Sequence, residues 1–235
     1  MIDYEKEFET PGYATRQTAV ARTFKVVYGW MAAGLALSGV VAWYAFTSGL
    51  WQKIVMGPWM TVCIVAEIGL VFLLSAAVNK VSAGVALAMF IGYAALNGLT
   101  LSVVFVAYNL ALVQNVFFIT AGMFAGLALW GTFTKNDLTS IGAFCGMALW
   151  GVIIASLVNI FVGSSGLDWI ISFVGIIVFT GLTMYDAQKI RQLAANEGAM
   201  DSSAVMKVGI IGALALYLDF INLFLSLLRL FGRER

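Results

Sequence analysis

Three acidic residues stand in apolar surroundings and could carry chemistry. Of the twelve Asp and Glu residues, Glu67, Asp186 and Asp219 lie within or at the edge of long apolar runs. A charge at the centre of a bilayer costs about 2.5–3.5 kcal/mol on insertion scales, so such a group faces the protein interior, finds a partner or holds a proton. The three acids predict an ion or proton pathway. The alternative is a polar clamp that only fixes helix packing.

Two of these acids could form one titrating unit. Asp219 lies within ALALYLDFINLFLSLL, where Asn222 follows three residues later on the same helical face and is its polar neighbour. Asp186 lies in GLTMYDAQKI, near the end of its apolar run. Two adjacent carboxylates cannot both ionise cheaply, so the pair can share one proton and act as a pH switch. When both are ionised, they offer the oxygen ligands that calcium prefers.

We therefore expect Asp186 and Asp219 to be the pH sensor, the ion pathway and a calcium site. The sequence leaves a second geometry open, in which Asp219 pairs with Glu67, because both acids lie near the middle of their apolar runs.

Long apolar runs must position these acids. The chain is 62% hydrophobic and only 11% charged, whereas soluble domains have roughly 25% charged residues. A run of about 20 apolar residues crosses a hydrocarbon core as a helix, and barrel strands would instead alternate every second residue. The sequence predicts an all-α integral membrane protein in the lipid bilayer, with seven transmembrane helices at 24–48, 58–78, 82–107, 113–133, 140–162, 168–186 and 207–228.

The predicted domain organisation is simple. Residues 1–23 form a short cytoplasmic N-terminal tail, and residues 24–235 form one seven-helix transmembrane domain. The first apolar run is too long for the core of a signal peptide, so we expect it to remain as a membrane anchor.

Charge and composition argue against other classes of protein. The net charge is +1 with no basic face, so nucleic acid is not an expected partner. The chain has no histidine, which removes the commonest general base and zinc ligand. Cys63 and Cys145 both lie in apolar runs and are expected to be reduced, buried thiols. We expect neither an enzyme nor a bound cofactor.

The distribution of Lys and Arg predicts the orientation in the membrane, because cytoplasmic loops carry the excess of these residues. With seven spans and the N-terminus inside, the outer side holds Lys53, Arg229, Arg233 and Arg235. The inner side holds more than twice as many cations, namely Lys6, Arg16, Arg22, Lys25, Lys80, Lys135, Lys189, Arg191 and Lys207. This bias favours a cytoplasmic N-terminus.

Two pairs of glycines have the spacing of helix-packing motifs. Gly122 and Gly126 lie in one run, and Gly142 and Gly146 lie in the next. Small residues four apart allow helices to approach closely in lipid. We expect these glycines to pack helices within one bundle rather than to form a dimer interface.

Several segments are similar to the Bax inhibitor-1 family, also called the transmembrane Bax-inhibitor-motif family. They are NGLTLSVVFVAY, GTFTKNDLTSIGAFCGMALWGVIIASLVNIF, TGLTMYDAQKI and ALALYLDFINLFLSLLRLFG. The resemblance runs from about residue 60 to the C-terminus. With short loops and no long N-terminal extension, it points to a bacterial member in the inner (plasma) membrane.

The resemblance implies a seven-helix fold with the seventh helix at the centre of the other six. It also implies a pH-sensitive calcium leak with a di-aspartyl unit, which by motif position is Asp186 and Asp219. The glutamate of helix 2 matches Glu67, and the arginine near the end of helix 7 matches Arg229, so the two can form a supporting ion pair. Some members carry an arginine that latches onto the aspartates, where this chain has Val78.

The leading hypothesis is a calcium leak channel gated by protonation of the aspartate pair, with calcium and protons as the transported or sensed ions. The alternative is a regulatory membrane protein without essential ion flux, which modulates a membrane-bound protease or a stress or cell-death pathway. A proton-coupled transporter would need internal repeats or broken helices, and the sequence shows neither. A long soluble tail would favour the regulatory class.

Overall fold

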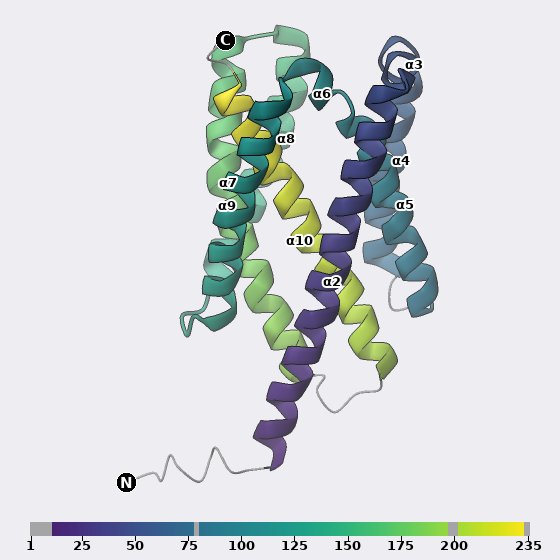
Figure 1. The fold of residues 1–235 in the computed structure, drawn as a ribbon. Helices are drawn as coiled ribbons and strands as arrows, with labels where there is room; N and C mark the ends of the chain where they lie inside the picture. The colour runs from purple at the N-terminus through teal and green to yellow at the C-terminus, as the bar shows by residue number, and fades with distance from the viewer. Residues whose placement is uncertain (1–10, 78–79, 197–201, 233–235) are drawn as a thin grey trace. The chain divides into compact units, whose positions relative to one another are not determined.

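The computed structural model describes residues 11–77, 80–196 and 202–232, and the regular secondary structure in these ranges is helical. The helices are drawn in Figure 1. In chain order they are α2 (Pro11–Thr47), α3 (Leu50–Met56), α4 (Trp59–Ala77), α5 (Ala83–Leu101), α6 (Val104–Ala107), α7 (Leu110–Phe133), α8 (Thr139–Val162), α9 (Ser165–Asn196) and α10 (Ser202–Phe231). The all-α prediction is confirmed.

Six of these helices are long and apolar enough to cross a membrane within the described residues. A seventh span is possible where α3 and α4 meet at a bend of 87°. The bend falls at Gly57-Pro58, where Gly57 is extended and ends α3 and Pro58 precedes α4. The predicted run 58–78 therefore forms a helix, but it counts as a span only together with the short helix before it.

The helix ends differ in detail from the prediction. The first helix begins at Pro11, well inside the predicted N-terminal tail. Asp168 lies in the first turn of α9, where a negative charge is favourable. The Ser164 hydroxyl is the cap, because it accepts a hydrogen bond from the Leu167 amide at 3.3 Å. Before α8, hydrogen bonds from the Thr139 hydroxyl and amide lower the pKa of Asp137.

The chain divides into two compact units. Unit 1 comprises Met1–Val103 and Lys189–Leu214, and unit 2 comprises Val104–Gln188 and Ala215–Arg235. The predicted 24–235 domain thus contains two clusters of internal contacts, and α9 and α10 each contribute one part to either cluster.

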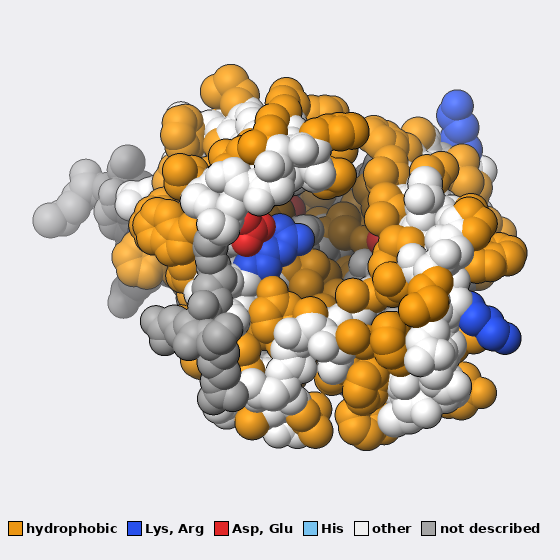
Figure 2. Space-filling model, turned by 90° about the horizontal axis from the view of Figure 1, so that it is seen from above, with side chains coloured by type: hydrophobic (Ala, Val, Ile, Leu, Met, Phe, Trp, Pro, Cys, Tyr) orange, Lys and Arg blue, Asp and Glu red, His pale blue; other side chains and the backbone are white. Residues whose placement is uncertain are grey.

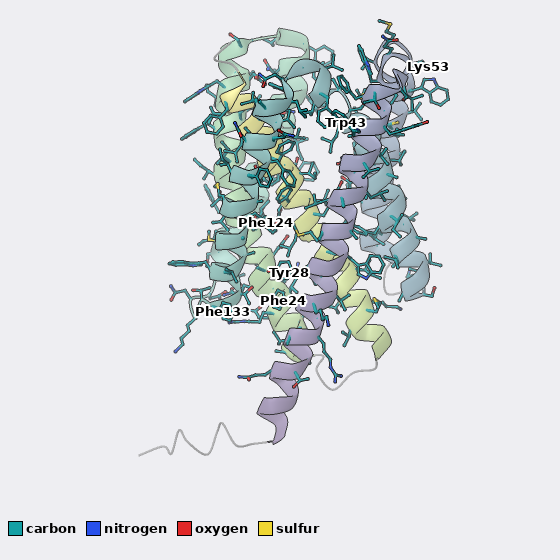
Figure 3. All side chains as sticks on the ribbon, viewed as in Figure 1. Phe24, Tyr28, Trp43, Lys53, Phe124 and Phe133 are labelled. Atoms are coloured by element: carbon teal, nitrogen blue, oxygen red, sulfur yellow. The ribbon has the colours of Figure 1, made fainter. Side chains whose placement is uncertain are left out.

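In unit 1, α5 packs against both α2 and α4. The Ser38 hydroxyl on α2 lies 2.7 Å from the Ala94 carbonyl oxygen on α5. A Cβ at Gly98 would lie 2.7 Å from the Ser38 carbonyl oxygen, so glycine permits this close approach. Figure 3 shows Trp43 and Lys53 at one end of the unit and Phe24 and Tyr28 nearer the other.

In unit 2, α7, α8 and α9 pack with the second part of α10. A Cβ at Gly131 of α7 would meet the Met184 backbone of α9, and one at Gly142 of α8 would meet the Tyr185 ring. Phe124, labelled in Figure 3, stands edge to face with Phe220 of α10, at 5.5 Å between ring centroids. These contacts hold α9 and α10 in a fixed register, which decides where their aspartates lie.

The predicted glycine contacts are confirmed at one position of the four. Gly142 packs against a neighbouring helix, whereas a Cβ at Gly122, Gly126 or Gly146 would meet nothing within 4 Å among the described residues.

This difference gives a matched pair of substitutions on one helix. Gly142→Ala places a methyl 2.7 Å from Tyr185 Cδ1, and such overpacking typically costs about 1–3 kcal/mol. Gly146→Ala places its methyl in open space and should leave stability unchanged. Thermal unfolding in detergent should show a lower Tm for the first variant only. Equal Tm values would contradict the close packing of α8 against α9.

A second test decides whether α3 and α4 form a span. Cysteine at Lys53, in the last turn of α3, and cysteine at Lys80, just after α4, should react with an impermeant thiol reagent from opposite faces. The native Cys63 and Cys145 are buried, so the wild type serves as the blank. Asn136 and Ser164 flank α8 and supply a reference pair on opposite faces. Labelling of positions 53 and 80 from the same face would show a re-entrant pair and six spans.

Candidate proton and ion site

The two aspartates lie in unit 2 on antiparallel neighbours, α9 and α10. Gly175 of α9 is opposite Ser226 of α10, since a Cβ at this glycine would lie 2.7 Å from the Ser226 hydroxyl oxygen. Asp186 lies towards the end of α9 from Gly175, and Asp219 lies towards the start of α10 from Ser226. The charge of Asp186 acts on Asp219. The missing side chain at Gly175 lets the two helices approach each other closely.

Asp219 is the most enclosed acidic side chain of this site. Only 4% of its surface is exposed, and its Oδ2 atom is buried without a hydrogen-bond partner among the described residues. An unsatisfied buried polar group costs about 1–3 kcal/mol, and more when it is charged. The carboxyl group therefore calls for a proton, a water molecule or a cation at Oδ2.

Asp186 is half-buried and lies close enough to Asp219 for their charges to interact. The structure therefore places the two acids within electrostatic reach of each other, and their action as one titrating unit stays a prediction. Within the described residues, no group of three or more His, Cys, Asp or Glu side chains could hold a metal ion. Calcium takes six to eight oxygen ligands in proteins, so at these two carboxylates it would need water or backbone oxygens to complete its coordination.

A third helix contributes Cys145, which the sequence analysis treated only as a buried thiol. Its Sγ atom lies against Gly181 of α9, in the space that a Cβ would fill, and the charge of Asp219 acts on it. The acid is therefore enclosed by α8 as well as by α9. In the sequence, the glycine of TGLTMYDAQKI, Gly181, is the residue that indicates a close contact with another helix at this point.

Asn222 follows Asp219 by one turn on α10, as predicted. Its amide nitrogen donates to the Leu218 carbonyl oxygen at 2.8 Å, so one of its two N–H donors is used on its own helix. It is a polar neighbour along the helix rather than the partner of the orphan oxygen.

Glu67 has its own partners in unit 1. The Thr100 hydroxyl lies 2.9 Å from Glu67 Oε1, and the Asn97 amide nitrogen lies 3.4 Å from Oε2. Both partners are on α5 and belong to the NGLTL segment. The segment NGLTL carries part of the family resemblance, and its two polar residues hold Glu67 in place.

The proposed partner of Glu67, Arg229, belongs to unit 2, so the pair between them stays a prediction. Val78, the position of the expected latch, lies outside the described residues.

Charged groups gather at the end of unit 2 where α8 leads into α9 and α10 ends. Tyr108, just before α7, is affected by both Arg229 and Asp168. Burial raises the pKa of Tyr108, and the positive charge of Arg229 partly offsets that effect. Figure 2 views this end of the molecule and shows acidic and basic side chains side by side among apolar ones.

Gln188 fixes the opposite end of the site, two residues after Asp186. Its Oε1 accepts from the Leu138 amide at 2.9 Å, and its Nε2 donates to the Asn136 carbonyl oxygen at 2.8 Å. The side chain is 3% exposed. It ties the loop between α7 and α8 to the turn of α9 that carries the acid.

These features define a class: an all-helical integral membrane protein with one acidic side chain, Asp219, buried among its helices. The family model described as "Inhibitor of apoptosis-promoting Bax1" matches residues 20–235, and the chain belongs to this Bax inhibitor family.

Bacterial relatives agree with this assignment. The Escherichia coli inner membrane protein YbhL is 46% identical over 211 residues, which cover 89% of this chain and 90% of the relative. A Deinococcus radiodurans protein is 44% identical over 93% of this chain and 91% of its own length. A Rickettsia prowazekii protein is 36% identical over the whole of both chains. The predicted location in a bacterial inner membrane is confirmed by the name of the E. coli relative and by the apolar helices.

The role of Gln188 can be tested by stability. Gln188→Leu leaves the Leu138 amide and the Asn136 carbonyl without their partner, and an unsatisfied buried group costs about 1–3 kcal/mol. We expect a lower Tm in detergent. Gln114→Leu changes an exposed glutamine of α7 and should leave Tm unchanged. A wild-type Tm for Gln188→Leu would mean that water replaces the side chain at no cost.

Proposed function

We propose that this protein is a pH-sensitive cation leak, with calcium as the transported ion, gated by protonation of Asp186 and Asp219. The observation that carries the proposal is the buried Oδ2 atom of Asp219, which has no partner among the described residues and lies within electrostatic reach of a second acid. A helix clamp would satisfy its oxygens with donors, as Glu67 does with Thr100 and Asn97.

The chemistry follows from the energetics of two acids in an apolar environment. Two like charges at short range cannot both persist in a site of low dielectric constant, so one proton is retained and shared. When it leaves, the pair becomes a doubly negative site that repels itself and attracts a hard cation. Protonation thus changes both the packing of α9 against α10 and the affinity for the ion.

The position of α10 supports this role. In its most apolar stretch 67% of the residues are buried, against 39% or less in each of the other five spans. A helix enclosed by protein rather than lipid can carry an acid at membrane depth, as the proposed central position in a seven-helix bundle requires. In this account the protein is not an enzyme, needs no bound cofactor, and works through its contacts with the bilayer, calcium and protons.

The test is calcium flux into liposomes that contain only this protein, measured across roughly pH 5 to 8, the range that a perturbed carboxyl group can reach. The wild type should show a flux that changes with pH. Asp186→Asn and Asp219→Asn should each lose this pH dependence, because the remaining acid no longer has a partner with which to share a proton. Asp137→Asn, a change of an exposed acid before α8, is the matched control and should keep the wild-type profile.

Folded Asp186→Asn and Asp219→Asn proteins with a wild-type pH profile would reject the switch. Absence of flux from the wild type at every pH would favour the regulatory alternative.

A further inference from the structure

A groove runs between α8, α9 and α10 within unit 2, and the site described above does not account for it. Its volume is about 240 Å³, enough for about eight water molecules at ~30 Å³ each. One wall is apolar, with Leu149 and Ile153 of α8 and Phe179 of α9 among its residues.

Four polar side chains lie among the apolar residues that line the groove. Asn222, Ser226 and Arg229 line it from α10 together with Leu225, and Ser156 lines it from α8. The three residues of α10 are spaced by four and three, so they share one face of the helix. The stripe begins one turn after Asp219 and ends at Arg229 in the last turn of α10. A polar stripe through an apolar span is costly unless it faces protein or water.

Each polar group in the stripe is held so that it can serve water. The amide nitrogen of Asn222 donates one hydrogen to the Leu218 carbonyl, which leaves its second N–H and its side-chain carbonyl oxygen for water. Ser226 keeps its hydroxyl against α9 because Gly175 has no Cβ there. Across the groove, the Ser156 hydroxyl donates to the Val152 carbonyl and leaves its lone pairs as acceptors.

Arg229 places a positive charge at one end of the groove. Its side chain is exposed and lines the end of the groove furthest from Asp219. Within the described residues, it is the only charged side chain among the groove's lining residues. A fixed positive charge at a mouth of low dielectric constant repels cations and attracts anions.

We propose that this groove is a water-filled route by which protons reach Asp219 from the Arg229 end of α10, and that Arg229 excludes cations from it. The inference rests on the proposed proton switch. It assigns protons and the conducted cation to two different routes through the protein. The titratable groups within electrostatic reach of Asp219 are Asp186 on α9 and Cys145 on α8. At the far end of the groove, the charges of Arg229 and of Asp168 in the first turn of α9 both act on Tyr108.

The test uses cysteine accessibility in the full-length protein in liposomes. Ser226→Cys should react with charged methanethiosulfonates, which modify only hydrated thiols, and Ser156→Cys is a second probe if the first variant does not fold. Leu227→Cys, buried and outside the groove, is the matched control and should stay unreactive. The wild type gives the background of the two buried native cysteines.

The charge of the reagent tests the role of Arg229. The anionic sulfonatoethyl reagent should modify Ser226→Cys faster than the cationic trimethylammonium reagent, each relative to its rate with free thiol. Adding Arg229→Gln should lower this ratio by roughly tenfold, as expected for removal of one charge at a few ångströms. An unchanged ratio would overturn the exclusion of cations and favour the pairing of Arg229 with Glu67.

The outcomes separate this inference from the proposed function. Modification of Ser226→Cys and Ser156→Cys by lipophilic reagents only would show a groove filled by lipid and overturn the water route, while the pH-dependent flux could still stand. The labelling could show a hydrated groove while Asp219→Asn keeps the wild-type pH profile of flux. These two results together would reject the proton switch and, with it, the assignment of the groove as a proton route.

Discussion

The burial of one carboxyl group, that of Asp219, is the constraint on which the rest of the account depends. A carboxylate cannot remain alone at membrane depth, because its desolvation is not repaid by water. One of its oxygens has no protein partner among the described residues, and its nearest acidic neighbour, Asp186, would make a full charge still more costly. The group is stable when it carries a proton, water or a cation. That same requirement makes its state sensitive to pH.

Close helix packing keeps the Asp219 carboxyl group buried near Asp186. In unit 2 the closest approaches to α9 occur at residues without side chains or opposite such residues: Gly131 against Met184, Gly142 against Tyr185, and Gly175 and Gly181 against Ser226 and Cys145. Gln188 adds two hydrogen bonds from α9 to the neighbouring loop. Interfaces of this kind have little freedom to adjust. In the proposed mechanism, a change of charge at the aspartates is therefore transmitted as a shift of whole helices.

Much of this could be predicted from the sequence, for reasons that are specific to membranes. Long apolar runs fix helix positions, and an acid inside such a run is conspicuous, so Asp219, Asp186 and Glu67 were found without a structure. The membership of the family was predicted from motifs that include both aspartates, and it is confirmed. The short helix α3 and its 87° bend to α4 were not predicted, because residues 50–56 lie between the predicted runs 24–48 and 58–78.

Side-chain partners were harder to predict. Asn97 and Thr100 of α5 contact Glu67 of α4, and Cys145 packs against Gly181 within electrostatic reach of Asp219. These neighbours depend on helix rotation, which periodicity does not define. Infrared difference spectroscopy of the purified protein between pH 5 and 8 tests the central claim most directly. The account predicts a protonated carboxyl band that titrates in roughly this range, disappears in Asp219→Asn and shifts in Asp186→Asn. A wild-type protein with no such band, or a band unchanged in Asp219→Asn, would contradict it.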